Sequence, residues 1–461
     1  MKNKIIYITI IVIALIIIPI CIIYANKQKE VNKKYEEQTT YEGQTVDEKN
    51  ITVTENENIA ITQSGTYKIT GKSTNSNITI NTEDEVTLIL DSLELTNKEG
   101  PAILIENSKH TTILLKNNNK LSNGENEEFD AVIYSKDDLT INGDGTLEII
   151  ANYENGIKCK DDLIINSNIT INSNTNGIIG KDSVTIKSGN INITSGGDAI
   201  KANNDEEESK GNITIENANI TINSQEDGIQ AEQTLTINNG TFNIKTSSGA
   251  KTLNGKTERD NTQTTSEESK KAIKASNIII NKGNFVIDSF EDGIHSNGNL
   301  TINNGTIEIK SSDDALHGDA LIEINDGTLN LTASEGIEGT YVKINGGNIT
   351  INAADDGINA GKKSNEYTPT IEINGGNITI QMSSGDTDAI DSNGNLYING
   401  GTLNITGNSP FDYDGEAKYT GGKLIVNGKE TTEITNQFMG GIQGGMQDRN
   451  MNGGPNQGMR R

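Results

Sequence analysis

A block of about 21–22 residues recurs along most of this chain. Each copy has an acidic-Gly-Ile step, a short Leu/Ile-Thr-Ile-Asn run, a glycine-containing turn and a second alternating run. A repeat of this length, made of short β-type runs and turn residues, is typical of a β-solenoid. Stacking superposes like positions, so an acidic position in the repeat becomes a column of carboxylates. The successive steps include Glu226-Asp227-Gly228-Ile229, Glu291-Asp292-Gly293-Ile294, Asp313-Asp314-Ala315-Leu316, Glu335-Gly336-Ile337-Glu338 and Asp355-Asp356-Gly357-Ile358.

The composition suits a solenoid better than a compact globule. Of the 461 residues 32% are hydrophobic, which is low for a globule of this length but enough for a thin core with a few aliphatic side chains per coil. The repeat therefore predicts one all-β domain over 51–430, although length alone suggests more than one domain. The formal net charge of −26 makes nucleic acid a poor partner and divalent cations natural ones.

The segments outside the repeat predict an extracellular protein, either membrane-anchored or secreted. Residues 1–25 carry a nearly continuous apolar run after Lys2 and Lys4, which indicates an uncleaved membrane anchor or a signal peptide cleaved after Ala25. A lipoprotein is a third alternative, because Cys21 ends a lipobox-like sequence. Residues 26–50 are expected to form a polar linker, and residues 431–461, rich in Gly, Met, Gln and Asn, a disordered tail.

Within a coil, period-two alternation assigns side chains to the interior. Leu235, Ile237, Phe242 and Ile244 are predicted to point inward, with the polar residues between them pointing outward. Asn-Asn-Gly or Asn-Gly-Gly turns, such as that at 238–240, separate the two runs, because Asn and Gly tolerate the positive φ of a sharp bend. The first Asn of these turns recurs in one register, so the stacked amides are expected to hydrogen-bond along the axis.

Three insertions interrupt the repeat, at 204–210, 253–270 and 362–369. Insertions in a solenoid leave as loops at a turn. We expect these loops to leave at one turn of the coil and to flank a groove. The alternative is that they are tolerated surface loops without a role.

The acidic step predicts columns of carboxylates on one face. Neighbouring coils lie about 4.8 Å apart, and two unit charges at this distance repel by roughly 3–4 kcal/mol at an effective dielectric constant of about 20. The repulsion can be relieved if the side chains splay into water, if some protonate, or if Ca²⁺ bridges them through carboxylate and carbonyl oxygens. The candidate Ca²⁺ ligands are Glu291, Asp292, Asp313, Asp314, Glu335, Glu338, Asp355, Asp356 and Asn359, with Asp227 and Asp388 further along the column.

The outward position after Gly-Ile also carries basic side chains. His295 and His317 are predicted to stack beside the acidic column, either as polar surface residues or as ligands of a transition metal. In a lyase, Lys201 or Lys274 would be the base that abstracts a proton near Ca²⁺. The alternative is that these lysines balance local acids. The chain has no Ser-His-Asp order, phosphate-binding loop or Cys/His metal spacing.

The acidic steps also resemble a known family, the bacterial secreted carbohydrate-binding domain proteins. The resemblance covers about 50–428 and rests on the tandem steps Ser334-Glu335-Gly336-Ile337-Glu338-Gly339 and Asp355-Asp356-Gly357-Ile358-Asn359-Ala360 with the run 343–351 between them. It implies a right-handed parallel β-helix similar to that of pectate lyases, Ca²⁺ bound by the acidic steps, and binding of cellulose or pectic polysaccharides without lyase activity. By position it points to Glu335, Glu338, Asp355 and Asp356, then to Asp313, Asp314, Glu291 and Asp292. The chain departs from the pattern at 315–318, where Ala-Leu-His-Gly replaces Gly-Ile.

The sequence thus predicts a surface-displayed, calcium-dependent polysaccharide-binding protein whose partner is an acidic pectic glycan or cellulose. The candidate sugar-contacting residues are Tyr341, Tyr367, His295 and His317. One alternative is a calcium-dependent polysaccharide lyase of the pectate type, and another is a structural adhesin or spacer without a glycan site. A monomer is expected, with membrane contact through the N-terminal segment.

Overall fold

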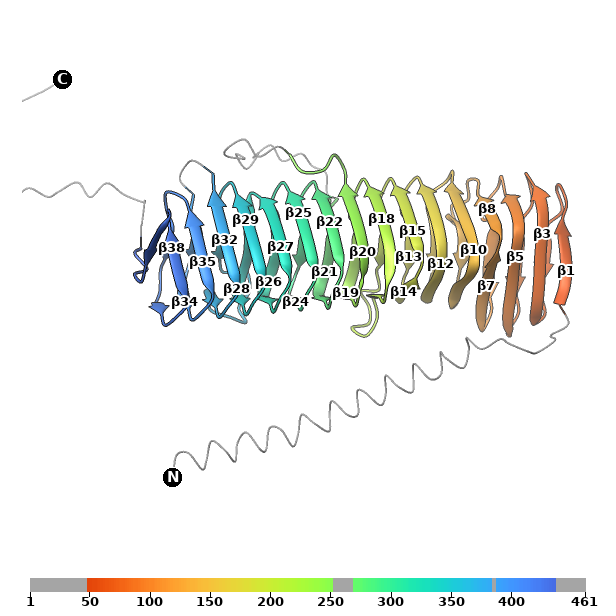
Figure 1. Cartoon of the computed structure of the whole chain (residues 1–461). Coiled ribbons are helices and arrows are strands. Elements are labelled where there is room, and N and C mark those ends of the chain that lie inside the picture. The colour runs from red at the N-terminus through yellow and green to blue at the C-terminus, as the bar shows by residue number, and fades with distance from the viewer. Residues whose placement is uncertain (1–47, 252–267, 384–386, 437–461) are drawn as a thin grey trace, which may run out of the picture. The chain divides into compact units, whose positions relative to one another are not determined.

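The computed structural model describes residues 48–251, 268–383 and 387–436, which form 39 strands (Figure 1). Within these ranges no helix has the length and apolar character needed to cross a membrane. The predicted anchor or signal segment at 1–25, the linker up to residue 47 and the tail from residue 437 lie outside the described residues. The predictions about them stay predictions.

The strands are short, and several continue through a bend into the next side of the coil. The first part of the chain contains β1 (Glu48–Val53), β2 (Ile59–Ile61), β3 (Gly65–Ser73), β4 (Ile78–Asn81), β5 (Glu85–Thr96), β6 (Ile103–Asn107), β7 (His110–Lys116), β8 (Asn118–Ser122), β9 (Ala131–Ser135), β10 (Leu139–Ala151), β11 (Asn155–Cys159), β12 (Asp162–Ser173) and β13 (Ile178–Gly180). The central part contains β14 (Ser183–Ser188), β15 (Asn190–Ser195), β16 (Ile200–Ala202), β17 (Asn212–Ile215), β18 (Ala218–Ser224), β19 (Ile229–Ile237), β20 (Gly240–Thr246), β21 (Ile273–Ile280), β22 (Asn284–Ser289), β23 (Ile294–Ser296), β24 (Asn299–Ile302), β25 (Thr306–Ser311) and β26 (Asp314–Ile324). The last part contains β27 (Thr328–Ala333), β28 (Glu335–Ile344), β29 (Asn348–Ala353), β30 (Ile358–Ala360), β31 (Thr370–Ile373), β32 (Asn377–Met382), β33 (Ile390–Ser392), β34 (Asn395–Ile398), β35 (Thr402–Thr406), β36 (Asp412–Tyr413), β37 (Ala417–Tyr419), β38 (Lys423–Val426) and β39 (Lys429–Thr431).

The strands stack into three parallel ladders, and each regular coil contributes one segment to each ladder. Ladder 1 carries the acidic steps and runs through β2, β4, β6, β9, β11, β13, β16, β19, β21, β23, β26, β28, β30, β33 and β36. Ladder 2 follows in the chain and includes β14, β17, β24, β31, β34 and the second halves of β19, β21, β26 and β28. Ladder 3 closes the coil and includes β15, β18, β20, β22, β25, β27, β29, β32, β35 and β38. The predicted all-β parallel solenoid is therefore confirmed, and β38 and β39 form an antiparallel hairpin at its end.

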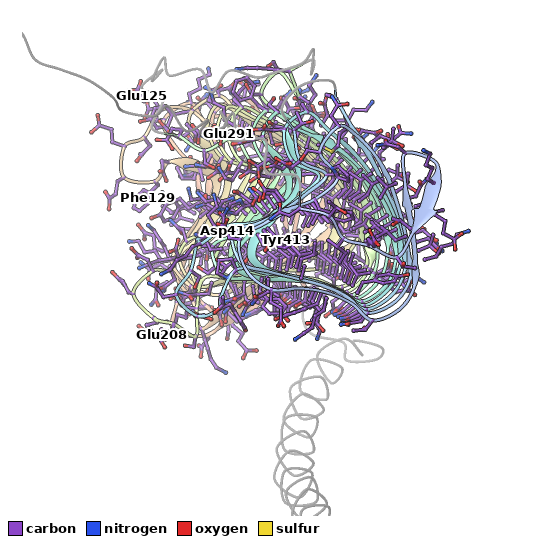
Figure 2. The ribbon with its side chains drawn as sticks, turned by 90° about the vertical axis from the view of Figure 1, so that its left-hand side faces the viewer. Glu125, Phe129, Glu208, Glu291, Tyr413 and Asp414 are labelled. Carbon is purple, nitrogen blue, oxygen red and sulfur yellow. The ribbon has the colours of Figure 1, made fainter. Side chains whose placement is uncertain are left out.

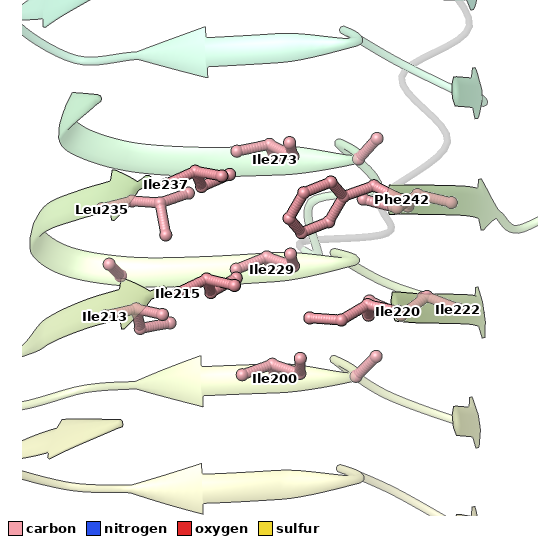
Figure 3. Close-up of a cluster of buried hydrophobic side chains, with 14 of the residues drawn as sticks. Ile200, Ile213, Ile215, Ile220, Ile222, Ile229, Leu235, Ile237, Phe242 and Ile273 are labelled. Carbon is pink, nitrogen blue, oxygen red and sulfur yellow. The ribbon is translucent and has the colours of Figure 1, made fainter. Parts of the chain in front are cut away.

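A thin apolar core runs between the ladders, as the alternation predicted. The four predicted inward residues, Leu235, Ile237, Phe242 and Ile244, are all fully buried. Figure 3 shows Leu235, Ile237 and Phe242 in this core. The ring of Phe242 stacks on that of Phe285 one coil later, with centroids 4.5 Å apart and planes at 6°. Because paired strands are parallel and in register, each apolar side chain packs on its own counterpart in the next coil, which is why so few residue types suffice.

The turns between ladders 2 and 3 carry the predicted amide ladder. The Nδ2 group of Asn303 donates to Oδ1 of Asn281 (2.8 Å), and Nδ2 of Asn325 donates to Oδ1 of Asn303 (2.9 Å). The same bond recurs from Asn345 to Asn325 and from Asn374 to Asn345. The amides thus link successive coils outside the backbone ladders.

The insertions leave the solenoid at two corners, so the prediction of one shared turn is wrong. The insertion at 204–210 lies between β16 and β17, and that at 362–369 between β30 and β31, which are both corners between ladders 1 and 2. The insertion at 253–270 lies between β20 and β21, at the corner between ladders 3 and 1. Any corner can lengthen if the strands on both sides stay in register. The insertions therefore flank ladder 1 from both sides.

We predict that Asn303→Ala lowers the free energy of unfolding by about 1–3 kcal/mol, because it leaves an amide donor and an amide acceptor of the two neighbouring coils without partners. Urea denaturation followed by circular dichroism measures this change. Asn330→Ala is the matched control, since the side chain of Asn330 is exposed on β27 and makes no hydrogen bond within the described ranges. Equal effects of the two substitutions would contradict a stabilising amide ladder.

Candidate functional site

The acidic column lies on ladder 1 in the predicted register. Asp314 pairs with Glu335 in the next coil, and the backbone N–H of Asp314 donates to Oδ1 of Asp292 (3.2 Å). Further along, the backbone N–H of Asp388 donates to Oδ1 of Asp356 (3.3 Å). The predicted vertical stacking of these acids is therefore confirmed.

Column side chains have a structural role that does not need a charge. Oδ1 of Asp198 accepts a hydrogen bond from the backbone N–H of Asp227 in the next coil (2.9 Å). In earlier coils asparagine does the same, because Oδ1 of Asn155 accepts from the N–H of Asn176 (3.1 Å) and Oδ1 of Asn176 accepts from that of Asp198 (3.0 Å). An amide oxygen is thus sufficient for this bond, and the negative charge in the later coils needs another explanation.

Two imidazoles stack beside the column, as predicted. The rings of His295 and His317 have centroids 4.4 Å apart and planes at 7°. Nδ1 of His295 lies 2.7 Å from a carboxylate oxygen of Asp292, and Nδ1 of His317 lies 2.6 Å from Asp314 and 3.0 Å from Glu338. Asp292 and Asp314 are 4% exposed and Glu338 is 6% exposed. For these three acids the predicted alternative of carboxylates splayed into water is wrong.

Two lysines at the insertions supply counter-charge that the sequence analysis missed. Lys271 occupies the column above Asp227, whose Oδ1 accepts its backbone N–H (2.7 Å), and its Nζ lies 3.5 Å from Asp292. Lys363, in the third insertion, places its Nζ 2.6 Å from Glu338. Lys271 directly follows the second insertion, and Lys363 lies within the third. Because the insertions break the repeat, the positions of these lysines in a coil cannot be predicted from its period.

Burial and opposite charge together set the protonation of this centre. Burial alone would lower the pKa of His317, but Asp314 and Glu338 raise it to about 11, so the imidazole is a cation at neutral pH. Burial would raise the pKa of Asp292, but its imidazole partner and Lys271 lower it to about 2. Burial beside Asp292 and Glu338 holds the pKa of Asp314 well above its ordinary value. The protonation of His317 and that of Asp314 are therefore coupled.

Further along ladder 1 the carboxylates lack such partners. Four of these acids form no ion pair with a basic side chain of the described ranges: Glu335, Asp355, Asp356 and Asp391. We call these four residues and Asn359 the carboxylate cluster. Burial and the carboxylates of Glu335 and Asp391 raise the pKa of Asp356 to about 8. Burial and a neighbouring carboxylate raise the pKa of Glu335 to about 7, and the same causes raise that of Asp391 to about 6. Carboxylates are thus crowded here without an ion-pair partner among the described residues.

An amide oxygen without a donor belongs to this cluster. Asn359 stands between Glu338 and Asp391 in the column of outward residues. Its Nδ2 group donates to Glu335 (3.0 Å), whereas its Oδ1 atom is buried and accepts no hydrogen bond from the described residues. A buried acceptor without a donor costs about 1–3 kcal/mol. Carboxylates with an unpartnered amide oxygen form the oxygen-only donor set that a hard cation such as Ca²⁺ prefers.

Potential ligand atoms converge within 4.8 Å of one another in three groups of described residues, all near the imidazoles. One group contains oxygens only, whereas the other two combine imidazole with carboxylate and suit a softer divalent metal. In those two groups the nitrogen already pairs with a carboxylate, so a metal would have to displace a proton there. The groups are Asp292–Asp313–Asp314, Asp292–His295–His317 and Asp314–His317–Glu338.

The two lysines considered as lyase bases are paired with acids. Nζ of Lys201 lies 2.7 Å from Asp198, and Nζ of Lys274 lies 3.9 Å from Asp227. Burial alone would lower the pKa of Lys201, but Asp198 raises it above its ordinary value. Lys201 thus holds its proton at neutral pH, which fits the alternative that these lysines balance local acids.

The four candidate sugar-contacting residues lie in two places. His295 and His317 are on ladder 1, whereas Tyr341 lies at the start of the ladder 2 part of β28 and packs edge-on against Tyr367 with ring centroids 5.6 Å apart. Tyr367 is 37% exposed. The insertion that carries Tyr367 also carries Lys363, so it contacts both ladders.

Sequence comparison assigns the chain to a family. A family profile described as "Carbohydrate-binding domain-containing protein" matches residues 55–315 and 313–447. The chain belongs to this family. The resemblance inferred from the acidic steps is therefore confirmed.

Two known proteins are similar to part of the chain. A carbohydrate-binding domain-containing protein of Acetivibrio thermocellus is 36% identical over 134 residues, which cover 26% of this chain and 46% of the relative. The match thus spans about half the length of that protein. A solved structure of the polysaccharide lyase-like protein from C. thermocellum, a gadolinium derivative, is 32% identical, with 43% of this chain and 90% of that chain covered and a TM-score of 0.41.

We predict that His317→Gln lowers the free energy of unfolding of the metal-free protein by about 2–4 kcal/mol, because it removes the cation that the buried Asp314 and Glu338 share and leaves Lys363 as the partner of Glu338 alone. Urea denaturation in EDTA measures the change. His110→Gln is the matched control, since His110 forms no ion pair with an acid of the described ranges. A similar loss for both variants would show that the buried ion pairs of His317 contribute nothing.

The carboxylate cluster predicts a pH dependence of stability. An acid whose pKa is raised by folding binds more protons in the folded than in the unfolded state, so the free energy of unfolding falls as pH rises between the two values. For Asp356 this window runs from 3.8 to about 8. Without metal, Asp356→Asn should flatten the decline across this window by about 1–2 kcal/mol, allowing for screening by solvent.

Denaturant titrations in EDTA at several pH values test this prediction. The asparagine oxygen can still accept the backbone N–H of Asp388, as asparagine does at positions 155 and 176. The substitution therefore removes the charge and keeps the hydrogen bond. Parallel pH profiles for the variant and the unmodified protein would contradict the prediction.

Proposed function

We propose that this carbohydrate-binding protein holds an acidic polysaccharide through Ca²⁺ bound at the carboxylate cluster. The observation that carries the proposal is the change of counter-charge along ladder 1. Near His317 the protein neutralises its own carboxylates, whereas Glu335, Asp355, Asp356 and Asp391 follow on the next coils without an ion-pair partner among the described residues. Such crowding is unfavourable unless a cation from solution relieves it.

The donor set of the cluster fits Ca²⁺ better than other common metals. It contains carboxylate and amide oxygens from adjacent coils, including the unpartnered Oδ1 of Asn359. Ca²⁺ takes 6–8 oxygen ligands in flexible geometry and readily keeps open positions for water or a further carboxylate. When bound, it would supply the positive charge that lets an acidic protein face an acidic glycan.

The side chains of this chain position the glycan rather than react with it. Ladder 1 presents one continuous face between two flanking corners, which suits an extended polymer. Tyr341 and Tyr367 offer aromatic surface at the edge of that face. The insertion that carries Tyr367 is joined to ladder 1 by the ion pair between Lys363 and Glu338. They suit stacking against the apolar face of a sugar ring. A uronate-containing glycan would use both features, whereas cellulose would use the tyrosines alone.

The two alternative functions have less support. A lyase needs a base with a lowered pKa near the substrate, and the pKa of Lys201 is raised. A rigid spacer explains the solenoid and the amide ladder. It does not explain why uncompensated carboxylates gather in a few coils when asparagine serves the same backbone bond in others.

We further propose that the protein acts outside the cell as a monomer with a right-handed solenoid. The apolar run in residues 1–25 supports export, either as a membrane anchor or as a cleaved signal peptide. The solenoid would then be displayed to polysaccharides that are too large to enter the cell.

The proposal predicts that Ca²⁺ raises the affinity for polygalacturonate about tenfold or more and that EDTA abolishes this gain. The double variant Glu335→Gln and Asp356→Asn should lose the gain and bind fewer Ca²⁺ ions. Affinity electrophoresis in polygalacturonate gels and calorimetric Ca²⁺ titration measure the two effects.

Glu308→Gln is the matched control for this experiment, because it removes a carboxylate that is exposed on β25 of ladder 3. It should behave as the unmodified protein. Retention that is the same with Ca²⁺ and with EDTA would remove the bridging mechanism. Retention on cellulose but not on polygalacturonate would shift the site to the tyrosines.

A further inference from the structure

A groove lies on ladder 1 well before the carboxylate cluster. Its volume is about 660 Å³, and Lys158, Ile179 and Lys201 form its floor in three successive coils. Asp130 and Glu268 line it on the side where the chain enters ladder 1. Figure 2 shows the loop with Phe129 and the loop with Glu208 extending on the same side of the solenoid. The groove is therefore bounded by segments from both corners of ladder 1.

Four lysines line this groove together with four acids, Asp130, Glu154, Glu226 and Glu268. Lys158 pairs with Asp130 (2.6 Å), Lys201 with Asp198 (2.7 Å) and Lys181 with the exposed Glu206 (3.2 Å). The fourth, Lys160, is exposed and forms no ion pair within the described ranges.

Two of these lysines are available to an incoming anion. Burial and the neighbouring lysines Lys158 and Lys181 lower the pKa of Lys160, whereas Asp130 acts in the opposite direction. The partner of Lys181 is Glu206, an exposed residue of the first insertion, and an exposed ion pair of this kind contributes less than about 1 kcal/mol to stability. An anion between Lys160 and Lys181 would therefore displace little.

We infer that this groove, which we call the lysine groove, binds carboxylates of a uronate-containing glycan directly, without metal. Lys160 and Lys181 would contact the carboxylates. The amide of Asn203, which makes no hydrogen bond within the described ranges, and the hydroxyl of Thr175 lie in the same groove and suit sugar hydroxyls. The inference rests on the proposed function and adds a second, chemically different subsite to it.

The lysine groove and the carboxylate cluster lie on the same ladder and can bind one polymer. From β11 to β30 the coils rise about 4.8 Å each, so the two sites are roughly 40 Å apart along the axis. A glycan that contacts both gains affinity because the second contact is intramolecular. The groove would supply a salt-sensitive, metal-independent part of binding, and the cluster a calcium-dependent part.

The experiment measures binding of the full chain to polygalacturonate in EDTA at low ionic strength, where the cluster cannot contribute through Ca²⁺. The double variant Lys160→Gln and Lys181→Gln should bind about five- to tenfold more weakly than the unmodified protein. Lys310→Gln, which removes one lysine exposed on ladder 3, should change binding less than twofold. Pectin with esterified carboxyl groups should not compete.

The outcomes separate the two proposals. If the double variant binds within twofold of the unmodified protein, or if esterified pectin competes equally well, the lysine groove does not bind uronate. If the lysine variant loses binding but Ca²⁺ has no effect on either protein, the lysine groove stands and the calcium proposal fails. If Ca²⁺ enhances binding and the lysine variant is unaffected, the calcium proposal stands and the groove fails.

Discussion

Hydrogen bonding between parallel strands of successive coils places each side chain directly above its counterpart, and the other features of this protein follow from that registry. For apolar side chains the result is favourable, because Phe242 packs on Phe285 and the isoleucines of ladder 1 on one another. For asparagine it is also favourable, since each amide has one donor and one acceptor direction along the axis. For carboxylates it is unfavourable, because like charges are brought within about 5 Å.

The protein relieves this unfavourable stacking differently in different coils. Early coils use Asn155 and Asn176, which provide the backbone hydrogen bond without a charge. Middle coils retain the acids and insert Lys271 and two imidazoles as counter-charge. In the carboxylate cluster the column keeps its acids, and they have no ion-pair partner among the described residues. The side chain at one repeat position is thus uncharged in early coils, a carboxylate with a cationic partner in middle coils, and a carboxylate without one in the cluster. This change along one face distinguishes the two proposed subsites.

Much of the fold and part of the site were predictable because they obey the period. The inward positions, the amide ladder and the stacking of His295 on His317 follow from spacing alone, and the structure confirms them. Lys271 and Lys363 were not predictable, because they come at or within insertions that interrupt the register. The burial of Asp292 and Asp314 was also missed, since exposure depends on how side chains from neighbouring coils and corners cover the column. Lys160 and Lys181 form a groove only because segments from two corners bound the same ladder.

The sequence by itself determined the coil, the core positions and the columns, because a repeat with a fixed period can satisfy its backbone and bury its aliphatic side chains in only one stacked register. It also established the family, since the acidic steps recur in tandem. The tertiary structure decided which column charges are compensated and which are not. That outcome depends on how far the lysines and imidazoles lie from the acids. Insertions and neighbouring coils set these distances, so the period of the repeat does not predict them.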